Sequence, residues 1–170
     1  MIYLPSVICN MFASATPIAL AGVGGMFGER SGITNIGLDG TMLFAAFTAV
    51  TTCYYTGSPW IALLAGILSG VLVSFLHAYF CISLKVDQTI IGLAVNILAA
   101  SVTVYASSSI FGNKGFTPSV TKLPNISIPG LRDLPVVGAF FDSASLVTLL
   151  VLPVVLLAHY LLYKTPFDMR

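Results

Sequence analysis

Glu29-Arg30-Ser31-Gly32-Ile33-Thr34-Asn35-Ile36-Gly37-Leu38-Asp39-Gly40 lies between two strongly apolar runs. This stretch places three charged residues, one asparagine and three glycines where the hydrophobic sequence would otherwise continue. Backbone that lacks helical hydrogen bonds is tolerated at bilayer depth only where protein or a water-filled cavity covers it. The stretch is therefore either a loop outside the membrane, with Asp39 in the first turn of the next helix, or the interruption of a discontinuous helix.

The composition indicates a membrane protein. Of the 170 residues, 57% are hydrophobic and 8% are charged, whereas soluble domains have about 25% charged residues. The mean hydropathy is +0.98. The formal net charge is +1 with no basic cluster, which excludes the electrostatic footprint of a nucleic-acid-binding protein. We expect a polytopic membrane protein that has no nucleic-acid partner.

Five apolar segments predict an all-α membrane helix bundle of about five spans. The second segment is short for an untilted crossing, so part of residues 33–40 would have to lie within the membrane. This shortness favours a discontinuous helix near residues 33–57. The predicted spans are about Leu4 to Phe27, Thr41 to Gly57, Trp60 to Leu84, Thr89 to Phe111 and Ser143 to Tyr163.

The fourth and fifth segments are separated by a long connection at residues 112–142. Four prolines and four glycines in this connection exclude a continuous helix. We expect an external loop that caps one side of the membrane, within a single transmembrane domain formed by residues 1–170. Nothing in the sequence repeats with a fixed period.

Small and polar residues inside the apolar segments predict close helix contacts. Gly66 and Gly70 form a GxxxG motif, which is typical of helix packing in membranes. Asn96 lies about a third of the way along the fourth segment, where its amide needs partners. Interhelical hydrogen bonding is the default interpretation of Asn96, and contact with a solute is the alternative. His77 also has two interpretations, a polar contact near a helix end or a group in a proton relay.

The sequence contains no motif for an enzyme or for a cofactor. It has no P-loop, no zinc-protease motif and no nucleophile elbow, so this chain has no P-loop site for ATP. The three cysteines are far apart in apolar runs, which indicates packing residues rather than metal ligands. Ionisable groups inside the apolar segments are few. A protein that transports a solute with so few ionisable groups in its membrane segments would take its energy from a partner protein.

Four separated stretches resemble the membrane permeases of ABC importers in the branched-chain amino acid and simple-sugar group, and within it the nucleoside-type subgroup. Two residues depart from the family pattern, because Asp39 stands where glutamate is usual and Asp168 where glycine is usual. The first stretch carries the most specific motif. The stretches are Ala15-Thr16-Pro17 continuing through Gly28 to Leu43, Asp87 to Ala99, Ile128 to Gly138, and Tyr163 to Arg170.

The resemblance implies a multi-pass permease of the cell (inner) membrane that works with a second permease subunit, cytoplasmic ATPase subunits that bind ATP, and an extracytoplasmic substrate-binding protein. It implies that Asn35, Asp39 and Asn96 face the translocation path of a nucleoside or a simple sugar. Permeases of this group are about twice as long, so the chain resembles their N-terminal half. The alternative is a truncated, non-transporting membrane remnant or scaffold.

Overall fold

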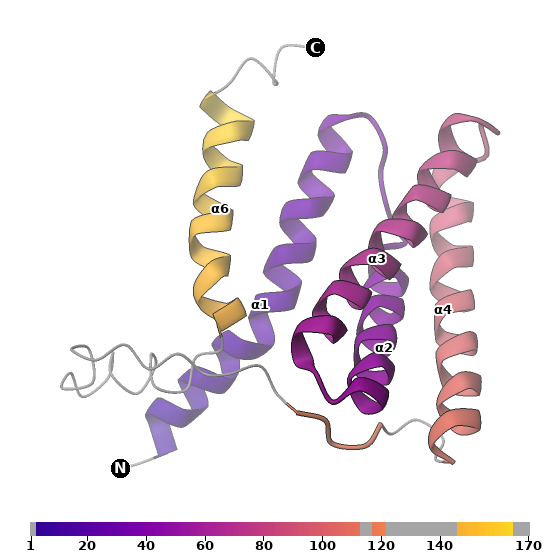
Figure 1. Ribbon diagram of the computed structural model, residues 1–170. Coiled ribbons are helices and arrows are strands. Elements are labelled where there is room, and N and C mark those ends of the chain that lie inside the picture. Colours follow the sequence, from indigo (N-terminus) through magenta and orange to yellow (C-terminus); the bar gives the residue numbers. More distant parts are fainter. Residues whose placement is uncertain (1–2, 113–116, 122–145, 165–170) are drawn as a thin grey trace. The chain divides into compact units, whose positions relative to one another are not determined.

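The computed structural model describes residues 3–112, 117–121 and 146–164 (Figure 1). Within these ranges the chain forms helices and no strand, so the all-α prediction is confirmed. The helices are α1 (Tyr3–Arg30), α2 (Leu38–Thr56), α3 (Pro59–Ile82), α4 (Gln88–Phe111) and α6 (Leu146–Lys164).

Each of these helices overlaps one of the predicted spans. By length and composition, α3 and α4 are long and apolar enough to cross a membrane, and α6 contains a shorter apolar stretch, Pro153–Leu162. The number of spans therefore stays a prediction. Helix α2 runs unbroken to Thr56, so the non-helical backbone is confined to residues 31–37. Nearly all of the predicted external loop at residues 112–142 lies outside the described residues.

The chain divides into two compact units, Met1–Arg30 with Leu123–Arg170, and Ser31–Lys122. In the first unit α1 packs against α6, and three of its described side chains are buried: Thr16, Ala158 and Leu162. The second unit consists of α2, α3 and α4. That the whole chain forms a single domain stays a prediction.

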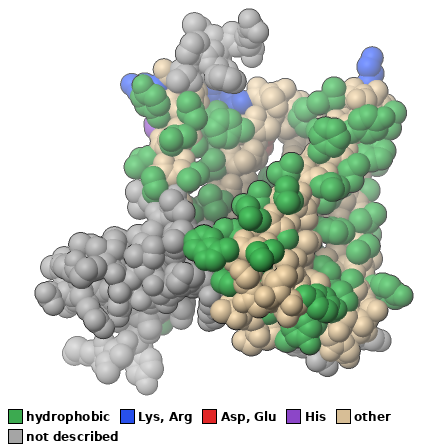
Figure 2. Space-filling model, in the orientation of Figure 1, with side chains coloured by type: hydrophobic (Ala, Val, Ile, Leu, Met, Phe, Trp, Pro, Cys, Tyr) green, Lys and Arg blue, Asp and Glu red, His purple; other side chains and the backbone are tan. Residues whose placement is uncertain are grey.

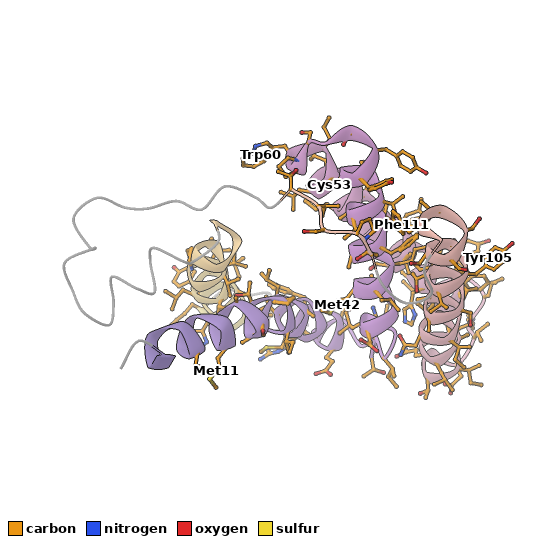
Figure 3. The ribbon with its side chains drawn as sticks, turned by 90° about the horizontal axis from the view of Figure 1, so that it is seen from below. Met11, Met42, Cys53, Trp60, Tyr105 and Phe111 are labelled. Atoms are coloured by element: carbon orange, nitrogen blue, oxygen red, sulfur yellow. The ribbon has the colours of Figure 1, made fainter. Side chains whose placement is uncertain are left out.

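The second unit has large apolar side chains outside and small or polar ones inside. Phe75 on α3 is 68% exposed and Tyr105 on α4 is 78% exposed, and Figures 2 and 3 show such side chains covering the outer faces of these helices. The buried positions of α3 and α4 are instead Ala62, Gly66, His77, Gly92, Ala99, Thr103 and Ser107. This is the distribution expected where lipid surrounds the helices and small residues let them approach closely.

Glycines set the distance between α2 and α3. A Cβ built on Gly66 would lie 3.1 Å from the Ala49 Cβ and 3.2 Å from the Ala45 carbonyl oxygen. A Cβ on Gly70 would lie 3.6 Å from the Ala45 Cβ, which is ordinary van der Waals contact. Gly66 is therefore the tighter of the two contacts with α2.

A short connection turns the chain from α3 into α4. Lys85 adopts the left-handed backbone conformation with φ 52°, and the Val86 N–H donates a hydrogen bond to the Phe80 carbonyl oxygen over 3.2 Å. The Asp87 carboxylate then caps α4 by accepting hydrogen bonds from the N–H groups of Thr89 and Ile90. The unpaired donors at the start of a helix favour such a cap.

Candidate functional site

The non-helical segment at residues 31–37 runs alongside the first turns of α4. At the start of α4, the Gln88 Oε1 accepts hydrogen bonds from the Thr34 N–H over 2.8 Å and from the Thr34 hydroxyl over 2.9 Å. One turn later, a Cβ on Gly92 would lie 2.9 Å from the Gly37 nitrogen. The segment is thus attached beside α4 rather than extending beyond its end.

Asn96 ties the start of α2 to the third turn of α4. Its Oδ1 accepts a hydrogen bond from the Gly40 N–H over 2.7 Å, and its Nδ2 donates to the Ile36 carbonyl oxygen over 3.1 Å. Gly37 precedes α2 and has no side chain to cap it. Asn96 therefore supplies from another helix the acceptor that an N-cap residue normally provides.

The contact between Gly40 and Asn96 leaves no room for a side chain. A Cβ on Gly40 would lie 2.8 Å from both the Asn96 Cα and its Oδ1, and 2.9 Å from the Val95 carbonyl oxygen. These distances are shorter than van der Waals contact, and two of the three atoms belong to backbone. Glycine at position 40 is what lets the Asn96 amide reach the start of α2.

The start of α2 lies well inside the length of α4. Asn96 follows Gln88 by eight residues in a helix of 24 residues, which is about 12 Å along an axis of about 36 Å. A bilayer has a hydrocarbon core of about 30 Å. For an untilted α4 centred in the bilayer, the polar backbone of residues 36–40 would lie below the headgroup region.

Asn35 and Asp39 are placed differently from Asn96. The half-buried Asn35 accepts a local hydrogen bond on its Oδ1 from the Gly37 N–H over 3.0 Å, which shapes the turn before α2. Asp39 is exposed in the first turn of α2. It has no hydrogen bond or ion pair with any other described residue. The structure brings Asn96 against residues 36–40 but does not bring all three predicted side chains together, and their contact with a solute stays a prediction.

Helices α2 and α4 are parallel and pack along a line that we call the α2–α4 seam, from Gly40 and Asn96 at one end to Tyr54 and Phe111 at the other. At the second end the Tyr54 and Phe111 rings meet edge to face, with centroids 5.1 Å apart. The Cys53 thiol also donates to the Thr121 carbonyl oxygen over 3.6 Å, which attaches residues 117–121 beside the same end.

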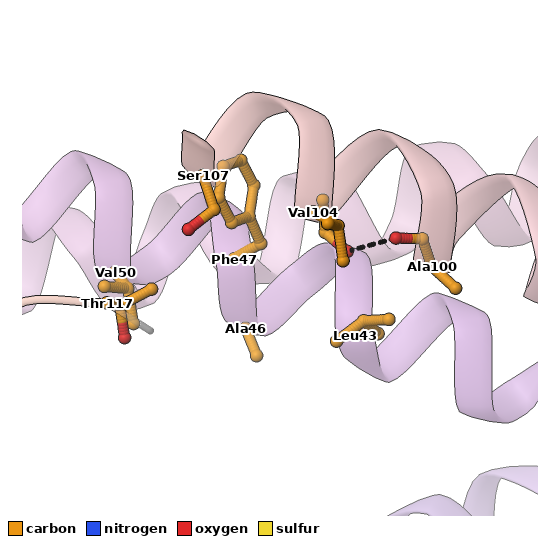
Figure 4. Close-up of a pocket in the computed structure, with 9 residues that line it drawn as sticks. Leu43, Ala46, Phe47, Val50, Ala100, Val104, Ser107 and Thr117 are labelled. Atoms are coloured by element: carbon orange, nitrogen blue, oxygen red, sulfur yellow. Dashed lines mark hydrogen bonds between the residues drawn. The ribbon is translucent and has the colours of Figure 1, made fainter. Parts of the chain in front are cut away.

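A groove of about 340 Å³ opens along the seam between these two ends (Figure 4). The sequence did not predict this groove, although the four-residue spacing of Thr103 and Ser107 on α4 was a visible signal. Asp39 lies four residues before Leu43 and so on the same face of α2 as the groove. The lining residues are Leu43, Ala46, Phe47, Val50, Ala100, Thr103, Val104, Ser107 and Thr117.

A second, polar pocket of about 440 Å³ lies at the connection between α3 and α4. The contact of Gly40 with Asn96 separates this pocket from the groove along α4. Its lining residues are Thr34, Cys81, Lys85, Val86, Asp87, Gln88 and Thr89.

His77 is buried in α3, with 3% of its surface exposed. Its Nε2 lies 3.5 Å from the Cys81 Sγ one turn later, and its Nδ1 has no hydrogen-bond partner among the described residues. The described ranges contain no group of three His, Cys, Asp or Glu side chains with the geometry of a metal site. The contact with Cys81 is the polar helix contact that was one of the two interpretations of His77.

Comparison with known proteins gives extended matches. The guanosine ABC transporter permease protein NupQ of Bacillus subtilis is 37% identical over 163 residues, which cover 92% of this chain and 51% of that protein. The nucleoside ABC transporter permease protein NupC of Lactococcus lactis is 36% identical, over 98% of this chain and 55% of that protein. The putative glucose ABC transporter permease protein TsgC13 of Haloferax volcanii is 35% identical, over 89% and 46%.

The chain spans about half the length of the curated relatives it matches. No solved structure matches it at a significant level. The family described as branched-chain amino acid transport system / permease component matches residues 7–169. A match over nearly the whole sequence, together with these relatives, shows that this membrane protein belongs to that permease family.

Proposed function

We propose that this chain is a membrane permease subunit of an ATP-driven ABC importer and forms part of the translocation path for a nucleoside or a simple sugar. The observation that carries the proposal is the polar segment at residues 31–40, which Asn96 holds about 12 Å along α4. Polar backbone at that depth is typical of a region that borders a solute pathway.

The surroundings of this segment support the proposal. Large apolar side chains cover the outside of α3 and α4. The groove opens on the seam beyond the contact between Gly40 and Asn96, and the polar pocket lies before that contact, where α3 connects to α4. A path that opens alternately to the two sides of a membrane requires cavities at two levels with a closed region between them. The Asp39 carboxylate, exposed at the level of the closed region, is a natural acceptor for the hydroxyl groups of a solute.

The energy and the remaining machinery would come from other chains. The permease family of the chain supports a transporter subunit, and since this sequence has no P-loop, ATP would bind to cytoplasmic ATPase subunits. A second permease subunit would complete the path, and an extracytoplasmic substrate-binding protein would deliver the solute. The chain would cross the cell (inner) membrane several times.

Uptake of labelled guanosine tests this function in cells that carry the complete transporter. We expect ATP-dependent uptake, which falls at least about tenfold in the Asp39→Ala plus Asn96→Ala variant because both the acceptor and the seam contact are lost. Ser101→Ala is the control, because Ser101 is exposed on α4 and donates only to the Ile97 carbonyl oxygen of its own helix. Uptake unchanged in the double variant would contradict the assignment of these residues to the path.

A non-transporting membrane scaffold is the second candidate function. The two candidates differ in whether the protein binds an ATPase. Co-purification of the tagged chain with an ATP-hydrolysing subunit, together with ATP-dependent uptake, would exclude the scaffold. A stable membrane protein that binds no ATPase would exclude the permease.

A further inference from the structure

We propose that the groove along the α2–α4 seam is the site that binds the base of a nucleoside, with the base stacked against the Phe47 ring. This inference rests on the proposed transport function and adds to it the position and the residues of the site. None of the groove residues was among the site residues predicted from the sequence.

The size and walls of the groove suit a flat heteroaromatic ring. Its volume of about 340 Å³ falls within the range of about 300–1,000 Å³ that is usual for small-molecule sites. Phe47 is the only aromatic side chain among the lining residues, and Figure 4 shows its ring reaching from α2 toward Ser107 on α4. Leu43 and Val50 flank Phe47 on α2, and Val104 lies on the facing helix α4. A base would therefore have one π-face to stack on and apolar contacts elsewhere.

Two of the three polar side chains of the groove lie on α4, and the hydroxyl of Thr103 favours a ligand that donates hydrogen bonds. The Thr103 hydroxyl gives its proton to the Ala99 carbonyl oxygen over 2.7 Å, so its oxygen lone pairs remain as acceptors. Ser107 is the next hydroxyl along the same face of α4, and Thr117 also lines the groove. Ring N–H and exocyclic amino groups of a base are donors of this kind.

A hexose fits the same walls poorly. Its hydroxyl groups point in all directions around the ring, and the aliphatic walls would leave many of them without partners. Burying a hydroxyl without a hydrogen bond is unfavourable in proteins. The ribose of a nucleoside avoids this cost if it lies toward the Asp39 end of the groove, where a carboxylate can accept its hydroxyl protons.

Uptake kinetics test the stacking contact. Removing a base–aromatic stack weakens binding by about 5- to 150-fold, so Phe47→Ala should raise the KM for guanosine at least about fivefold. Phe47→Trp keeps an aromatic face and should restore most of the affinity. Phe75→Ala removes an exposed ring on the outer face of α3 and is the matched control, with an unchanged KM.

Thiol labelling tests occupancy without depending on transport. In a complete transporter whose native cysteines are replaced by serine, Ala100→Cys places a thiol in the groove, and Leu68→Cys places one on the outer face of α3. We expect guanosine to slow the reaction of the groove thiol with a small methanethiosulfonate at least about fivefold, and glucose to leave it unchanged. Neither solute should affect the thiol at position 68.

The outcomes separate this inference from the function on which it rests. Loss of guanosine uptake by the unmodified transporter would remove the proposed function. Uptake that persists with an unchanged KM in Phe47→Ala would overturn the inference alone. A thiol at position 100 that reacts equally with and without guanosine, or that another helix shields completely, would also overturn it.

Discussion

Asn96 joins two parts of the chain through both ends of one amide group. Its oxygen accepts from Gly40 and its nitrogen donates to the Ile36 carbonyl, so a single side chain satisfies a donor and an acceptor that lie outside the regular hydrogen bonds of α2. Neither could be left unpaired in an apolar environment without a large cost. The short distances around Gly40 follow from this contact.

The Gly40→Ala substitution should destabilise the protein by about 1–3 kcal/mol, because the new Cβ would overlap the Asn96 Cα and the Val95 carbonyl oxygen. Thermal unfolding of the purified protein in detergent measures the effect. Gly24→Ala is the matched control, since Gly24 lies inside α1 with no heavy atom within 4 Å of the built Cβ. Equal melting temperatures for the two variants would contradict the close contact at Gly40.

At the scale of the elements, α2 is held from two sides by different means. Against α3 it packs through Ala45 and Ala49 on the Gly66 surface. Against α4 it is fixed by hydrogen bonds at its start and by the Tyr54 and Phe111 rings near its end. Between the hydrogen bonds at the start of α2 and the rings near its end, most side chains along the seam are small (Ala, Ser, Thr and Val). The groove opens there because these side chains do not fill the space between the helices.

The two glycines of the GxxxG motif should respond differently to the same substitution. Gly66→Ala should lower stability by about 1 kcal/mol, because the neighbouring Ala45 carbonyl oxygen is backbone and cannot move away easily. Gly70→Ala should be neutral or stabilising by about 0.5–1 kcal/mol, because the new methyl makes an ordinary contact and alanine favours the helix. Denaturation of both variants in the same detergent gives the comparison, and an equal loss for both would refute the difference in packing.

At the scale of the whole molecule, the distribution of apolar side chains suits an apolar environment. Few side chains are buried deeply, and none of the large ones among the described residues is fully buried. Most of the large apolar surface of α3 and α4 therefore faces outward. Such a surface requires lipid or other helices around it, in agreement with the permease family to which the chain belongs.

Trp60, the one tryptophan of the chain, provides a test of this arrangement. It is 51% exposed in the first turn of α3, where an interfacial aromatic residue is expected. In reconstituted vesicles, lipids brominated near the headgroup should quench its fluorescence more strongly than lipids brominated near the end of the acyl chain. Quenching by a water-soluble quencher alone would show that α3 begins outside the bilayer.

The sequence by itself determined the class of structure and the approximate helices. Apolar segments of near-spanning length predicted each described helix to within a few residues, because segment hydropathy is a local property. The polar stretch before Leu38 was recognised for the same reason. Interhelical hydrogen bonding was the default interpretation of Asn96, since an amide in an apolar segment needs a partner wherever the helices lie.

Only the tertiary structure decided which partner that was and where the groove opens. Gly40 and Asn96 are 56 residues apart, and the groove combines α2 with the far half of α4 and with Thr117. Such contacts depend on the register of two parallel helices, and no local pattern of residues specifies that register. The close approach of the backbones at Gly40 sets the register of α2 against α4. Between this contact and the rings of Tyr54 and Phe111, the side chains of the two helices leave a space, and the groove lies there.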